Sequence, residues 1–136
     1  MSVEIREFAS VDELIKFIDA QIDALRKQLG ELLRAIEETR IKAEQERKLK
    51  SLLAKLTGGA VPESPVIELK AVKLYINPSA ESEISLLEQA AEAINNKMMA
   101  LQAVRRDLET LGTAEISTSL RVIVIDGVPR AVVIKV

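Results

Sequence analysis

The chain of 136 residues contains no cysteine and no histidine, and only 2% of its residues are aromatic. Without cysteine it can form no disulfide and carries no thiolate nucleophile. Without histidine it lacks the commonest general base near neutral pH and the commonest transition-metal ligand. No phosphate-binding glycine loop or acidic metal loop is present either. The sequence therefore predicts no catalytic residue, no metal site and no cofactor, and it indicates a protein that is not an enzyme.

Long hydrophobic runs and an excess of one charge are also missing. A spanning helix needs about 20 apolar residues, and the longest aliphatic runs here are far shorter. The net charge of −2 gives no general attraction to nucleic acids or membranes. The start MSVEIREF has neither the basic residues nor the apolar stretch of a secretory signal. We therefore expect a cytoplasmic protein, and its high Lys and Glu content leans towards a thermophilic source.

A long first helix is predicted over residues 10–57. Ser10 and Glu13 fit a capping box at its start, and Gly58 and Gly59 are typical of its end. Its apolar residues recur at alternating spacings of four and three, which is the heptad pattern of a coiled coil. They are Val11, Ile15, Ile18, Ile22, Leu25, Leu29, Leu32 and Ile36.

A second heptad helix is predicted over residues 78–111, with Asn77 as its N-cap and Pro78 in its first turn. The charges favour an antiparallel pairing of the two helices, because the basic end of the first then lies beside the acidic start of the second. In this pairing we expect Arg105 and Arg106 to lie near the glutamates of the first helix at positions 31, 37 and 38.

The remaining segments read as strands. Residues 66–76 alternate as one strand whose apolar phase changes near Ala71, and a bulge there would restore one apolar face. Residues 117–136 form a C-terminal β-hairpin about the turn Asp126-Gly127, with Pro129 opposite Val124 and the edge beyond it unpaired. In an alternative topology, strand 66–76, the second helix and the first hairpin strand form a right-handed βαβ unit.

These elements predict one α+β domain over residues 1–136: an antiparallel coiled-coil hairpin of two long helices with a small β-sheet. The first helix is longer than the second, so its beginning would lack a cover, and both faces of the C-terminal hairpin are largely aliphatic. Exposed surface of this kind predicts a homo-oligomer, at least a dimer. The residues expected at its interface are Ile15, Ile18, Ile22, Leu25, Ile123, Ile125, Val132 and Ile134.

The only basic cluster lies near the end of the first helix. It could contact phosphates by charge alone, although no aromatic residues are interleaved with it. The residues expected to do so are Arg40, Lys42, Arg47, Lys48 and Lys50. A solvated helix face is the alternative interpretation.

The stretch IDAQIDALRKQLGELLRAIEETR, residues 18–40, resembles the first arm of prefoldin subunits. The resemblance covers roughly residues 10–111. Prefoldin subunits place one or two β-hairpins between their helices, where this sequence predicts one strand. The resemblance implies an oligomer assembled through strands, with helical arms that hold unfolded clients on apolar patches. We therefore expect a non-enzymatic coiled-coil scaffold or adaptor, including a prefoldin-like ATP-independent chaperone; the alternative is a nucleic-acid-associated factor.

Overall fold

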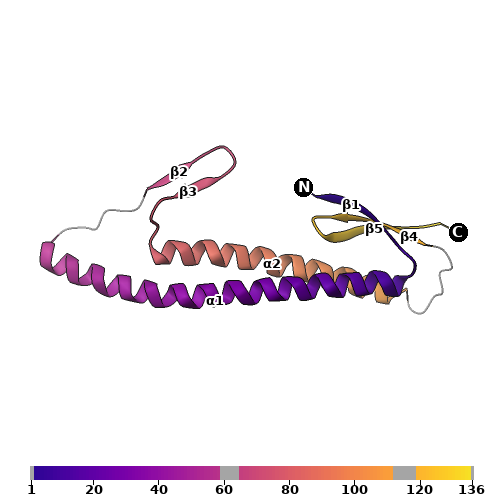
Figure 1. The fold of residues 1–136 in the computed structure, drawn as a ribbon, viewed down its shortest axis with the longest axis horizontal. Helices are drawn as coiled ribbons and strands as arrows, with labels where there is room; N and C mark the ends of the chain where they lie inside the picture. The colour runs from indigo at the N-terminus through magenta and orange to yellow at the C-terminus, as the bar shows by residue number, and fades with distance from the viewer. Residues whose placement is uncertain (1, 59–64, 112–118, 136) are drawn as a thin grey trace. The chain divides into compact units, whose positions relative to one another are not determined.

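A computed structural model describes residues 2–58, 65–111 and 119–135 (Figure 1). The elements are β1 (Val3–Phe8), α1 (Val11–Thr57), β2 (Val66–Glu68), β3 (Lys73–Tyr75), α2 (Ala80–Glu109), β4 (Leu120–Ile125) and β5 (Val128–Ile134). The predicted α+β class, with two helices and a C-terminal β-hairpin, is confirmed. The predicted boundaries at residues 59, 112, 117 and 136 lie outside the described residues.

The chain divides into two compact units, where the sequence predicted a single domain over residues 1–136. The first unit combines residues 1–29 with residues 92–136, and the second unit comprises residues 30–91. Both long helices run through the division, so each helix contributes one segment to each unit.

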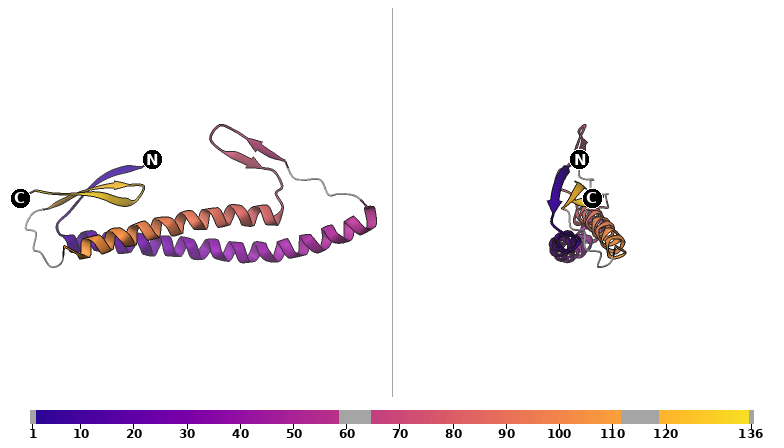
Figure 2. Two further views of the ribbon diagram at one scale, coloured as in Figure 1. Left: turned by 180° about the vertical axis from the view of Figure 1, so that it is seen from behind. Right: turned by 90° about the vertical axis from the view of Figure 1, so that its right-hand side faces the viewer.

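The first unit is a three-stranded antiparallel sheet with two helix segments on one of its faces (Figure 2). The strand order is β1-β4-β5. Along β4, Leu120, Val122 and Val124 are buried, whereas the residues between them are not, because successive side chains of a strand point to opposite faces. The helices supply the rest of the core. The buried cluster is Phe8, Val11, Leu14, Ile18, Ile22, Leu25, Met98, Leu101, Leu108, Leu120, Val122, Val124 and Val128.

Strand β1 was not predicted. It pairs antiparallel with β4 from Val3↔Ile125 to Phe8↔Leu120. Its alternation of Val3 and Ile5 with charged residues is the signal that could have found it. Because β4 lies between β1 and β5 in an antiparallel sheet, the alternative βαβ topology is wrong.

Both ends of α1 carry the predicted caps. The Ser10 Oγ accepts a hydrogen bond of 3.2 Å from the Glu13 N–H, and the Glu13 carboxylate accepts one of 3.0 Å from the Ala9 N–H. At the other end, the N–H of Gly58 donates to the Ala54 carbonyl at 2.9 Å. Gly58 has a φ of 63°, the left-handed conformation that glycine adopts after a helix.

The start of α2 differs from the prediction. Asn77 has a φ of 46°, whereas an N-cap residue has an extended backbone. The cap is Ser79, whose Oγ accepts a hydrogen bond of 3.2 Å from the Ser82 N–H. The next residue, Ala80, donates its N–H to the Glu46 carboxylate of α1 at 2.9 Å.

Within the second unit, the contacts between α1 and α2 run in antiparallel order. Arg47 pairs with Glu81 at 3.2 Å, and Arg40 pairs with Glu88 at 3.9 Å. The basic part of α1 therefore lies beside the acidic start of α2, as the charge pattern predicts. In the first unit, however, Arg105 pairs with Asp19 at 2.7 Å and not with the glutamates at positions 31, 37 and 38.

Residues 66–76 form a β-hairpin instead of the predicted single strand. β2 pairs antiparallel with β3 in the register Val66↔Tyr75, Ile67↔Leu74 and Glu68↔Lys73. The chain reverses at Lys70 and Ala71, where the apolar phase changes. A two-residue turn and a bulge each change which alternate residues share a face, so the pattern alone does not tell them apart. The turn contains no glycine, proline or asparagine that would have indicated it.

Candidate protein-interaction surfaces

The helical half of the predicted oligomer interface belongs to the chain's own core. Ile18 is fully buried, Ile22 and Leu25 are buried, and Ile15 packs against the same cluster. The prediction that this end of α1 lacks a cover is wrong. The last part of α2 and the sheet cover it, and the ion pair from Arg105 to Asp19 lies at the same level.

The strand half of the predicted interface divides between the two faces of the sheet. On β5, Ala131 lies opposite Ile123 and Pro129 lies opposite Val124, so Arg130 is the extra residue of a bulge. A one-residue shift reverses the face of every following side chain. Val132 and Ile134 therefore lie opposite Val122 and Leu120, on the helix side, and the predicted interface residues Ile123 and Ile125 lie on the other face.

The other face of this sheet, which we call the outer sheet face, is aliphatic along most of its length. The pairing of the strands places Val3, Ile5, Ile123, Ile125, Ala131 and Val133 on it. Val128 lies opposite Ile125 but is buried in the core cluster, so it adds nothing to the exposed face. Ile123 and Ile125 are partly buried, but Val3 and Ile5 keep 62% and 65% of their surface exposed. A surface of this kind is typical of a site where another polypeptide packs.

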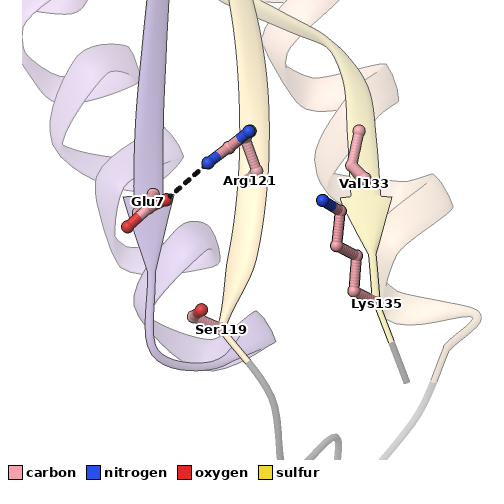
Figure 3. Close-up of a pocket in the computed structure, with 5 residues that line it drawn as sticks. All are labelled: Glu7, Ser119, Arg121, Val133 and Lys135. Carbon is pink, nitrogen blue, oxygen red and sulfur yellow. Dashed lines mark hydrogen bonds and ion pairs between the residues drawn. The ribbon is translucent and has the colours of Figure 1, made fainter.

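An open hollow with a mixed charged and apolar lining lies at one end of the outer sheet face (Figure 3). It is lined by Glu7, Ser119, Arg121, Val133 and Lys135. The Arg121 guanidinium donates a hydrogen bond of 3.3 Å to the Glu7 carboxylate across the β1–β4 pair. Because both side chains are more than half exposed, the hollow is an open, mixed-charge rim and not an enclosed binding site.

In the second unit, the β2–β3 hairpin has one entirely aliphatic face. The Leu69 N–H donates to the Val72 carbonyl at 3.0 Å, and the Ile76 N–H donates to the Pro65 carbonyl at 3.2 Å, so these pairs extend the register of Ile67 and Leu74. The opposite face holds an ion pair between Glu68 and Lys73 at 3.6 Å. We call the aliphatic side the hairpin face: Ile67, Leu69, Val72, Leu74 and Ile76, each exposed by 42 to 58%.

The end of α1 carries a further exposed apolar stripe. Leu49, Leu52 and Leu56 follow Glu46, whose carboxylate meets the first residue of α2. Their spacing of three and four places them on one side of the helix, and they keep 54 to 73% of their surface exposed. The part of α1 with the least cover is therefore its end and not its beginning.

The predicted phosphate-binding residues are mostly engaged with carboxylates. Arg40 pairs with Glu37 and Glu88, and Arg47 pairs with Glu81. Lys48 lies 4.0 Å from Glu44. Lys42 and Lys50 are exposed and have no carboxylate partner among the described residues. The cluster therefore presents little unpaired positive charge.

Arg105 joins α2 to α1 through a charged network in the first unit. The Asp19 carboxylate, which accepts its hydrogen bonds, raises the pKa of Arg105, and Glu109 on the same helix adds to this effect. A guanidinium is already charged at every ordinary pH, so the role of this network is to orient the two helices.

None of the described helices is sufficiently long and apolar to cross a lipid bilayer. Over the same residues, no group of three or more acidic side chains is placed to hold a metal ion. Comparison with protein families, with curated proteins and with solved structures found no match to this chain.

Proposed function

We propose that this chain is a non-enzymatic scaffold or adaptor that assembles with copies of itself through coiled-coil and strand contacts. In this assembly it holds apolar segments of unfolded polypeptides without ATP, as a prefoldin-like chaperone does. The observation that carries the proposal is the hairpin face, an entirely aliphatic side of a two-stranded hairpin with about half of its surface open to water.

A hairpin of two strands is marginally stable in water on its own. Covering the exposed half of five aliphatic side chains is worth on the order of 5 kcal/mol as an upper bound. The loss of translational and rotational freedom on association costs about the same or more. A single hairpin face should therefore bind a client weakly and reversibly, which suits a protein that holds clients and releases them.

The order of the elements supports a prefoldin-like arrangement. The hairpin stands between α1 and α2 in the chain, at the place where prefoldin subunits carry theirs. The heptad spacing of both helices and the antiparallel order of their ion pairs are consistent with coiled-coil arms. The exposed leucines at the end of α1 offer a second apolar surface in the same unit.

The proposal is tested by diluting a chemically denatured client protein into buffer with and without this chain, in the absence of nucleotide. Light scattering should show that the chain suppresses aggregation. Replacing Leu69 and Leu74 together by glutamine should remove most of the suppression, because both residues lie on the hairpin face.

The matched control replaces Glu68 and Lys73 together by glutamine. This variant changes the same two strands but leaves the hairpin face intact, so it should suppress aggregation as well as the unmodified chain. No suppression by the unmodified chain, or an equal loss in both variants, would contradict the proposal.

A further inference from the structure

Strand β1 leaves one edge of the three-stranded sheet open. Asp126 donates its N–H to the Ser2 carbonyl at 2.7 Å, directly beyond the pair Val3↔Ile125. Along an antiparallel pair of strands, residue pairs joined by backbone hydrogen bonds alternate with pairs that are not. The backbone groups of Glu4 and Arg6 therefore point to β4, and those of Val3, Ile5 and Glu7 point away from the sheet. Within the described part of the chain, no other strand pairs with this edge.

The two edges of the sheet are not equivalent. On β5, Pro129 has no N–H to donate, and the bulge at Arg130 interrupts the ladder, both of which protect an edge from pairing. β1 contains no proline, and its register with β4 is continuous from Val3 to Phe8. Of the two edges of this sheet, as far as its residues are described, only β1 offers an incoming strand a regular row of donors and acceptors.

The charges of β1 discriminate between the partners and the registers that could use this edge. When two copies of β1 pair antiparallel through their free groups, the pairing is symmetric about one residue. A centre on Glu4 places two Glu4 side chains opposite each other, and a centre on Arg6 places two Arg6 side chains opposite each other. A centre on Ile5 instead places each Glu4 opposite Arg6 of the other copy, and opposite charges in such pairs stabilise a sheet.

The side chains of the edge are already arranged for this register. The Arg6 guanidinium lies over the Phe17 ring at 4.5 Å and pairs with Glu4 of the same strand at 3.5 Å. Both side chains remain about half exposed, so each can also reach the second copy. On the outer sheet face, the same register brings the two exposed Ile5 side chains together.

We propose that β1 pairs antiparallel with β1 of a second copy about Ile5, forming one continuous sheet with three strands from each copy. About six backbone hydrogen bonds would form at the new edge contact. This inference rests on the proposed homo-oligomer and names the surface that joins two copies. The charges at positions 4 and 6 could instead serve to keep the edge unpaired, as charged residues do in monomeric sheets, and the experiment separates the two.

The first experiment uses the absence of cysteine from the chain. In the proposed register the two Ile5 Cα atoms face each other at about 5.5 Å, which suits a disulfide. Ile5→Cys should therefore form a covalent dimer under mild oxidation. The matched control is Val3→Cys, on the same strand with similar exposure, whose two copies would be roughly 13 Å apart and should not cross-link. The double variant V3C/E7C should cross-link, since these positions face each other.

The second experiment tests whether the charges of Glu4 and Arg6 act between the two copies. E4R places two positive charges on each edge, and R6E places two negative charges there. Each variant alone should dimerise roughly tenfold more weakly or worse, measured as the dissociation constant by analytical ultracentrifugation. An equimolar mixture should recover the association, because opposite charges again meet across the edge. A contact within one copy could not be restored by mixing.

Equal cross-linking of I5C and V3C, or a mixture that associates no better than its components, would overturn the inference. If I5C fails to fold, the V3C/E7C pair and the mixing experiment decide the question alone. If the chain forms an oligomer that holds clients but I5C and V3C/E7C form no cross-link, this inference is refuted and the proposed function stands. If the dimer cross-links through β1 but holds no client, the proposed function is refuted and this inference stands.

Discussion

The carboxylate of Glu46, in the last third of α1, accepts a hydrogen bond of 2.9 Å from the backbone N–H of Ala80, the first residue of α2. The first N–H groups of a helix have no partner within it and carry a partial positive charge. Glu46 therefore satisfies one of these donors from a neighbouring helix, while Ser79 satisfies another from within the chain's own turn. The contact fixes where α2 begins along α1.

Replacing Glu46 by alanine should lower the free energy of unfolding by about 1 kcal/mol, the usual value of a lost helix cap. Glu46→Gln keeps an oxygen acceptor but loses the charge that interacts with the helix dipole, so its loss should be smaller. Urea denaturation at one fixed protein concentration measures both. Glu44→Ala is the control, because Glu44 lies on the same helix and only approaches the exposed Lys48. An equal effect of the two alanine variants would argue against a capping role.

Ile18 tests whether the early part of α1 is core or interface. It is fully buried among residues of both helices and the sheet, so Ile18→Ala should lower the free energy of unfolding by about 2–5 kcal/mol. Leu33→Ala, at an exposed position of the same helix, should cost less than about 1 kcal/mol. Chemical denaturation measures the stability and light scattering measures the oligomeric mass. An Ile18→Ala variant of unchanged stability but reduced mass would restore the original prediction of an interface at this position.

The sequence correctly predicted the helix ends and turns that depend on only a few neighbouring residues. The capping pair of Ser10 and Glu13 marks the start of α1, and the turn Asp126-Gly127 adopts positive φ at both residues, as its sequence predicts. Where two local signals were equivalent, the prediction failed. The phase change near Ala71 fits a bulge as well as a turn, and Asn77 and Ser79 both resemble N-caps.

The sequence could not show which surfaces the chain covers by itself. The heptad pattern predicts the buried side of α1 but not how far along it α2 lies, and the ion pair between Arg105 and Asp19 fixes that. The missing strand β1 had a larger effect, since it completes the sheet and adds Val3 and Ile5 to the outer sheet face. The bulge at Arg130 then moved Val132 and Ile134 to the helix side. Exposed apolar surface remains, but most of it lies on residues outside the predicted set. Of that set, Ile123 and Ile125 lie on the outer sheet face, and Ile134 keeps 41% of its surface exposed.

Binding to duplex DNA tests the alternative function of the basic cluster. Because Arg40 and Arg47 are paired with glutamates of α2, we expect no binding in fluorescence anisotropy even at low salt. A positive result would show affinity that falls steeply as salt increases, because bound cations release counterions from the phosphates. Loss of that binding in a variant with Lys42→Gln and Lys50→Gln would then support the nucleic-acid-associated alternative against the scaffold.

Two glycines should respond to the same substitution with opposite signs. Gly127 has a φ of 79° in the β4–β5 turn, and a Cβ there would lie 2.7 Å from the Lys97 Nζ. The flexible lysine can move, but the left-handed backbone of a non-glycine residue costs about 1–2 kcal/mol. Gly127→Ala should therefore destabilise the chain by this amount. Gly30 lies inside α1 with open space around it, so Gly30→Ala should stabilise the chain by about 0.5–1 kcal/mol through helix propensity. Urea denaturation of both variants at equal concentration measures the difference, and a stabilising Gly127→Ala would contradict the turn geometry on which the register of β5 depends.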